Sequence, residues 1–163
     1  MRSRTVNGKI FFSGAILALA AGLAQRPLHA IQAPAEGLQQ GPPAGDPHSE
    51  EERAAERQAL GFLGYLDHGR YADSYAYTGM LIRAQLNSEA FAKELEHARA
   101  GVGALLSRNL TDAAYATTVA GAPAGEYVVL HYAASFANRQ DAMETVTLAF
   151  AKGYWRVSGY YIK

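Results

Sequence analysis

The side chains that could carry acid–base chemistry are few in this chain of 163 residues. His131 alternates with the apolar residues of a predicted strand, so it faces either a groove or an interface between subunits. Asp67 and Asp73 lie on either side of a predicted turn between two helices, and Glu144 lies beside a hairpin, where we expect it to be exposed. A histidine and a carboxylate inside a cavity can act as a general acid–base pair. We therefore take His131 and Asp67 as candidate ligand-binding residues.

Tyrosine is abundant, with ten copies in the chain. Tyr132 and Tyr161 lie on predicted strands and are two further candidate ligand-binding residues, because phenols lining a pocket would suit an aromatic ligand. The alternative, which we favour, is that the tyrosines fill a small core with their rings while their hydroxyl groups reach water.

Signatures of established catalytic and metal sites are missing from the sequence. The absence of cysteine excludes disulfides, cysteine-ligated zinc, iron–sulfur clusters and thiol catalysis. His68, His97 and His131 are far apart in the sequence and form no metal-binding motif. No G-x-S-x-G motif occurs, and the glycines around Val102 lack the third glycine of a dinucleotide-binding loop. We expect no catalytic residues, no cofactor and no bound metal.

Two arginines flank the predicted turn at residues 101–103. Arg99 precedes it and Arg108 follows it. Together they could bind an anion, although two arginines around a loop more often form ion pairs or surface charge.

The first 24 residues are typical of a secretory signal peptide. Arg2, Arg4 and Lys9 precede an apolar run that ends at Ala24, with small residues suited to cleavage there or, more weakly, at Ala30. The 15 residues of the run would span only about 22 Å as a helix, short of the hydrocarbon core of a membrane. We therefore expect cleavage and a periplasmic or secreted bacterial protein, with an uncleaved anchor as the alternative.

Residues 25–48 are predicted to be a disordered linker, because they hold five of the six prolines and no hydrophobic periodicity. Removing three of the 15 basic residues with the signal peptide would leave 12 basic and 15 acidic residues. Such a mildly acidic protein gives no reason to expect binding to nucleic acid, or to a membrane once the signal is cleaved.

Residues 49–163 are predicted to form a single domain that begins with helices. Ser49 and Glu52 have the spacing of a capping box at the start of a helix over about 50–68. A looser helical pattern over 70–85 breaks near Gly79, and a third helix follows Asn87.

The hydrophobic period changes to two from Leu105 onwards, which predicts about four antiparallel strands joined by short turns. On the last strand we place Trp155, Val157 and Tyr161 on the core face. The fold class is therefore α+β, with the N-terminal helices packed on one face of a curled antiparallel sheet. A second sheet face is too apolar to be fully hydrated, and it carries Val129, His131, Ala133, Thr145, Thr147 and Ala149.

Several motifs resemble those of the domain of unknown function 4019 family. The segment from Phe62 to Tyr75 resembles its opening motif, two aromatics followed by D-x-G-x-Y-x-x-S-[WY]. Gly125–Val129 is similar to its G-E-Y-V-V strand, and Trp155–Ile162 to its W-R-V-S-G-Y-Y-I ending. The resemblance covers about residues 54–163 and implies an exported bacterial protein with no assigned activity. The order of elements also resembles the nuclear transport factor 2-like, or cystatin-like, superfold.

Two functions are compatible with these observations. We favour a non-enzymatic module that binds another protein or forms a homodimer through the second sheet face. The alternative is a pocket protein that binds a small molecule or acts as an isomerase or dehydratase, which the superfold resemblance implies but does not decide.

Overall fold

The computed structural model describes residues 9–10 and 48–163. The helical part confirms the predicted order, including the break near Gly79. Asn87 caps the last helix by accepting a hydrogen bond from the N–H of Ala90. The helices are α1 (Ser49–Asp67), α2 (Tyr71–Ser74), the 3-10 helix η1 (Tyr75–Tyr77), α3 (Met80–Arg83) and α4 (Ser88–Ala98).

The predicted capping box at the start of α1 is wrong. The helix is preceded by His48, which makes no side-chain cap, and Ser49 already lies inside the first turn, where its hydroxyl accepts a hydrogen bond from Arg53. The Glu52 carboxylate does not reach back along the helix. It accepts a hydrogen bond from the N–H of Tyr115 instead, at 3.2 Å. A tertiary contact has thus replaced the local one.

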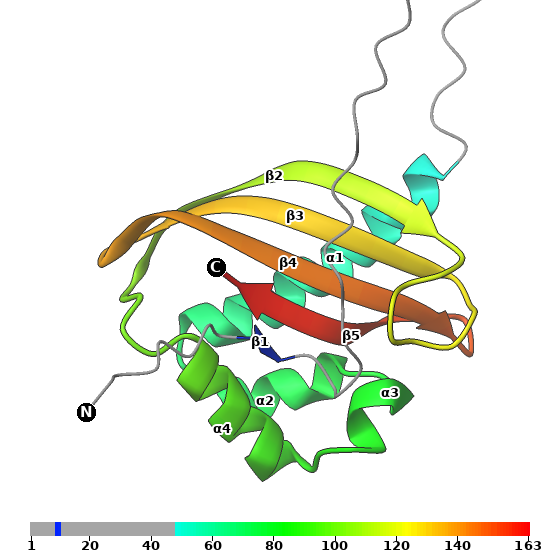
Figure 1. Cartoon of the computed structure of the whole chain (residues 1–163), viewed down its shortest axis with the longest axis horizontal. Helices are drawn as coiled ribbons and strands as arrows, with labels where there is room; N and C mark the ends of the chain where they lie inside the picture. The colour runs from blue at the N-terminus through cyan, green and yellow to red at the C-terminus, as the bar shows by residue number, and fades with distance from the viewer. Residues whose placement is uncertain (1–8, 11–47) are drawn as a thin grey trace, which may run out of the picture.

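The strands form one antiparallel sheet that is not closed into a barrel, as Figure 1 shows. Its order across the sheet is β1-β5-β4-β3-β2, so the four long strands are a simple meander. The α+β fold class is therefore confirmed, whereas the closer resemblance to the nuclear transport factor 2-like superfold stays a prediction. The strands are β1 (Lys9–Ile10), β2 (Leu105–Ala116), β3 (Tyr127–Phe136), β4 (Arg139–Ala151) and β5 (Tyr154–Ile162).

The core lies between α1 and the inner face of the sheet, with α1 running behind the strands in Figure 1. Phe62 and Leu63 of α1 are fully buried, as are Leu130 of β3 and Leu148 of β4. Burying each leucine stabilises the fold by roughly 1.5–3 kcal/mol. This packing fixes which residues of each strand point inward, and thereby places the polar groups described below.

Tyr161 lies on the opposite face of β5 from the one predicted. Thr147 pairs with Gly159 while the next residue, Leu148, pairs with Val157, so Ser158 is an extra residue in β5. Such a bulge reverses the inward and outward alternation beyond it. Tyr160 and Ile162 are consequently buried, whereas Tyr161 is only half-buried.

Most of the predicted signal peptide and linker lies outside the described residues. The exceptions are His48, which precedes α1, and Lys9–Ile10, which pairs antiparallel with the end of β5. None of the described helices is long and apolar enough to cross a membrane.

Candidate functional site

A two-point ion pair joins the end of α1 to β2 at the centre of the structure. Nη1 of Arg108 donates to Oδ2 of Asp67 at 2.7 Å, and Nη2 of Arg108 donates to Oδ1 at 2.9 Å. Arg108 points inward because it pairs across the sheet with Ala134, which is itself an inward-facing residue of β3. The small side chain of Ala134 leaves room for the guanidinium.

Arg108 also binds a second carboxylate. Its Nε donates to Oε2 of Glu144 at 2.6 Å, while Oε1 of Glu144 accepts a hydrogen bond of the same length from the hydroxyl of Tyr160. Glu144 is fully buried, although the sequence led us to expect it to be exposed. Its partners lie on the two strands β2 and β5, so this carboxylate links the edges of the sheet's inner face.

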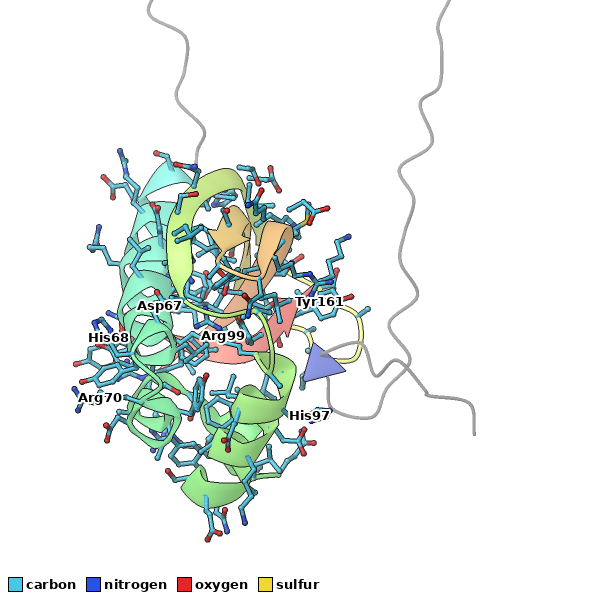
Figure 2. The ribbon with its side chains drawn as sticks, turned by 90° about the vertical axis from the view of Figure 1, so that its left-hand side faces the viewer. Asp67, His68, Arg70, His97, Arg99 and Tyr161 are labelled. Carbon is cyan, nitrogen blue, oxygen red and sulfur yellow. The ribbon has the colours of Figure 1, made fainter. Side chains whose placement is uncertain are left out.

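Arg99, just beyond α4, completes the cluster. Its Nη2 donates to Oδ1 of Asp67 at 2.9 Å and lies 3.8 Å from Oε1 of Glu144. The guanidinium carbon of Arg99 lies 5.0 Å from the ring centre of Phe136. At this distance the electron-rich face of the ring attracts the positive charge of the arginine. We call Asp67, Arg99, Arg108, Glu144 and Tyr160 the polar cluster. In Figure 2, Asp67 and Arg99 point toward each other in the interior, whereas His68 and Arg70 point away from it.

Two positive and two negative charges balance within the polar cluster. Burial acts to raise the pKa of Asp67, but the hydrogen bonds and charges of Arg108 and Arg99 outweigh burial and lower it below its ordinary value. Burial acts to lower the pKa of Arg108, and its two carboxylate partners raise it instead. Burial and the nearby charge of Glu144 raise the pKa of Tyr160 well above normal. Near neutral pH, Asp67 is therefore ionised and Tyr160 is protonated.

A small cavity of about 210 Å³ lies beside the polar cluster, between the end of α1, the loop after α4 and the start of β2. Asp67 and Arg99 contribute to its wall. Nη1 of Arg99 is buried and makes no hydrogen bond among the described residues. The cavity could admit a small polar molecule, but both oxygens of Asp67 already accept hydrogen bonds from arginine.

The four candidate residues from the sequence are divided between the two faces of the sheet. Asp67 and Tyr132 lie on the inner side, and His131 and Tyr161 lie on the outer side. Nδ1 of His131 is within 3.0 Å of Oγ1 of Thr145, its cross-strand neighbour. The structure therefore does not bring His131 and Asp67 together as an acid–base pair.

Tyr132 is almost completely buried, so its ring fills the core as expected, but its hydroxyl group is buried as well and does not reach water. Its hydroxyl makes no hydrogen bond within the described part of the chain. Burial raises the pKa of this phenol, and the charge of Glu56 adds to the effect. Tyr132 therefore stays protonated and serves in packing.

Sequence reasoning missed the role of Glu144, although a signal for it was present. Ala142, Val146 and Leu148 lie on the same face of β4 as Glu144, at alternate positions, and all point inward. A carboxylate at an inward position needs a buried cation, and Arg108 was available on the inward side of β2. Arg99 and Arg108 were identified as a pair, but their partners were not. The inward position of Tyr160 was not predicted, because the bulge at Ser158 reverses the alternation of β5.

The described residues, 9–10 and 48–163, contain no group of three or more histidine, aspartate and glutamate side chains arranged to hold a metal ion. His68 is exposed, with Nδ1 2.7 Å from the carbonyl oxygen of Gly64, and His97 is exposed in the last turn of α4.

Comparison with known proteins gives one family. A profile described as "Protein of unknown function (DUF4019)" matches residues 58–160, which is most of the domain. The match includes every member of the polar cluster. Among curated proteins, none matches the chain.

Proposed function

Because the chain belongs to the DUF4019 family of proteins of unknown function, no activity is inherited from relatives, and we propose one from the site itself. We propose that the protein is an exported, non-enzymatic module that binds a second copy of itself through the outer face of its sheet. The observation that carries the proposal is that the buried acid–base groups on the inner side are bound to one another.

The protonation states of the polar cluster argue against enzymatic activity. A general acid or base works best with a pKa near the working pH and with a free position for the substrate. Asp67 has a lowered pKa and accepts hydrogen bonds on both oxygens. The Tyr160 hydroxyl is committed to Glu144. Near neutral pH Asp67 therefore stays ionised and Tyr160 stays protonated, so neither group exchanges a proton with a substrate.

The composition of the outer sheet face indicates where a second copy would bind. Its uncovered part, which we call the outer patch, has Ala133 opposite Met143 and His131 opposite Thr145. Ala133 is exposed, and 38% of Met143 is exposed. The other end of the face is already covered, because Thr147 lines a small pocket together with Val119–Ala122 of the loop between β2 and β3. Apolar side chains on a partly uncovered sheet face suit isologous pairing with a second copy.

Export is supported by the signal-peptide pattern of the first 24 residues. The mature protein would be mildly acidic, which favours solubility outside the cytoplasm.

Sedimentation velocity over a dilution series tests this function. The expected result is a dimer that dissociates on dilution, and a shift to monomer at all concentrations in Ala133→Arg, because the new charge would be buried in the interface. Ala76→Arg is the matched control, since Ala76 is exposed on η1 in the helical part. The proposal fails if the wild type is a monomer throughout, or if the two variants behave alike.

A small-molecule-binding protein is the second candidate, and the cavity of about 210 Å³ beside Asp67 and Arg99 favours it. The buried Nη1 of Arg99 without a partner gives such a ligand one donor to satisfy. Native mass spectrometry would show extra mass per subunit if a ligand is retained, and that mass would be lost in Arg99→Gln.

A further inference from the structure

We propose that the outward edge of β5, over Gly159–Ile162, is a strand-addition site for an extended segment of another protein, and that Lys9–Ile10 is an intramolecular stand-in for it. The proposed occupant is a proline-free peptide in which a basic residue precedes apolar residues. The inference rests on the proposed export, because removal of the first 24 residues is what would free this edge.

The hydrogen-bonding pattern shows which groups the edge offers. Lys163 and Met143 exchange both backbone hydrogen bonds, at 2.8 and 3.0 Å, so Lys163 faces β4. In an antiparallel ladder, alternate residues of a strand face the same neighbour. Tyr161 therefore also faces β4, while the N–H and C=O groups of Tyr160 and Ile162 point away from it, toward β1.

At Val157, before the bulge, this edge of β5 already pairs with another segment of the chain. The N–H of Gly79 donates to the carbonyl oxygen of Val157 at 2.9 Å, and Thr78 forms a parallel bridge with the same residue. The stretch beyond the Ser158 bulge is where the structure shows an added strand. There, Ile10 pairs with Tyr160 and Lys9 pairs with Tyr161.

The opposite edge of the sheet is protected in the usual ways, and the stretch Gly159–Ile162 of β5 is not. β2 has two irregularities in register and carries Arg108 and Asp112, and Glu52 accepts the hydrogen bond of the Tyr115 N–H. Bulges, charges and covering groups prevent unwanted strand pairing. Gly159–Ile162 contains no charge and no proline. An uncharged edge of this kind requires a strand beside it or will recruit one.

The chemistry of the occupant follows from the strand now present and from its surroundings. β1 lies between β5 and α4, and Figure 2 shows it between Tyr161 and the end of α4 that carries His97. Glu89 of α4 is paired with Lys93, which leaves Glu94 and Glu96 as the acidic residues toward the end of α4 that carries His97. This negative helix favours a basic residue in the added strand, as in the segment Lys9-Ile10-Phe11-Phe12.

Amide hydrogen exchange in the full 163-residue chain tests the proposal. Ile10→Pro removes the backbone N–H that faces the carbonyl oxygen of Tyr160 and so disrupts the pairing of β1 with β5. The amide of Tyr160 should then exchange at least about fivefold faster. The amides of Tyr161 and Lys163 face β4 and should not change, which shows that the fold is intact. A synthetic peptide of residues 6–13 should then restore protection, and the same peptide with an N-methyl group on Ile10 should not.

Each other outcome overturns the proposal. Unchanged exchange in Ile10→Pro would mean that the edge does not take a strand, and failure of the unmodified peptide to restore protection would mean that it is not a site for an added segment. Protection retained with a doubling of mass would make a second copy the occupant. The outer patch is untouched in this variant, so its dimerisation, tested by Ala133→Arg, succeeds or fails separately.

Discussion

Nη1 of Arg108 lies 2.7 Å from Oδ2 of Asp67, which fastens the last residue of α1 to the inner face of β2. The two residues are 41 positions apart, and the chain between them holds the helices from α2 to α4. Charges in such a place cost free energy of desolvation and stabilise the fold only if they are fully paired.

Replacing Asp67 with asparagine should be strongly destabilising. Arg99 and Arg108 would both lose a charged partner while their side chains stay 4% and 9% exposed. We expect the free energy of unfolding to fall by about 3 kcal/mol in urea denaturation. The control is Asp73→Asn, whose partner Arg70 and own carboxylate are 60% and 53% exposed, with an expected loss below about 1 kcal/mol. Equal losses would show that the cluster does not stabilise the fold.

The contribution of Asp67 should also depend on pH. Because its pKa is lowered in the folded state, this contribution is complete above the ordinary value of 3.8 and is lost as the pH falls through the folded-state pKa. The difference in unfolding free energy between wild type and Asp67→Asn should therefore be constant from neutral pH down to about pH 5 and then shrink. Denaturation curves at a series of pH values measure it. A difference that grows toward acid would reverse the assigned direction.

Arg108 and Glu144 should be energetically coupled. Each single replacement, Arg108→Met or Glu144→Leu, leaves a buried charge with a lost partner, whereas the double variant removes both sides of the contact. The double variant should cost at least about 1 kcal/mol less than the sum of the two single variants. The exposed pair of Lys93 and Glu89 is the control, with coupling below about 0.5 kcal/mol. Simple additivity at Arg108 and Glu144 would contradict the arrangement.

Two glycines in α1 should respond differently to alanine. A Cβ at Gly64 would have nothing within 4 Å, so Gly64→Ala should stabilise the protein by about 0.5–1 kcal/mol through helix propensity. A Cβ at Gly61 would meet the ring of Tyr77 at 2.6 Å, so Gly61→Ala should gain less or lose stability. Thermal unfolding of both variants makes the comparison. A larger gain at Gly61 would be inconsistent with this packing.

The order of helices and strands could be predicted from the sequence, because periodicity and turn residues are local. The capping box at Ser49 failed for the opposite reason, since Glu52 has a better partner in Tyr115, 63 residues away. The alternation on β5 was correct up to Val157 and reversed after Ser158, because a single inserted residue leaves no mark in the hydrophobic pattern.

The polar cluster was only partly predictable. Asp67 was identified as a candidate for binding, and Arg99 and Arg108 as neighbours around a turn, yet each was considered without its partner. Glu144 was placed at the surface because it lies beside a hairpin, although it shares a face of β4 with the inward-pointing Ala142 and Val146 and is buried. The ion pairs of the polar cluster depend on tertiary contacts between α1, β2, β4 and the loop after α4. The local sequence around each charged residue does not show which opposite charge it will contact.

The ionisation of Asp67 is the most direct test of the claim that the polar cluster is structural. A carbon-13 NMR titration of its carboxyl group in the folded protein would measure the pKa itself. We predict a value below the ordinary 3.8, so that Asp67 stays ionised through the whole neutral range. A carboxyl group that titrates between about pH 5 and pH 8 would be able to exchange a proton with a substrate, and it would contradict the account.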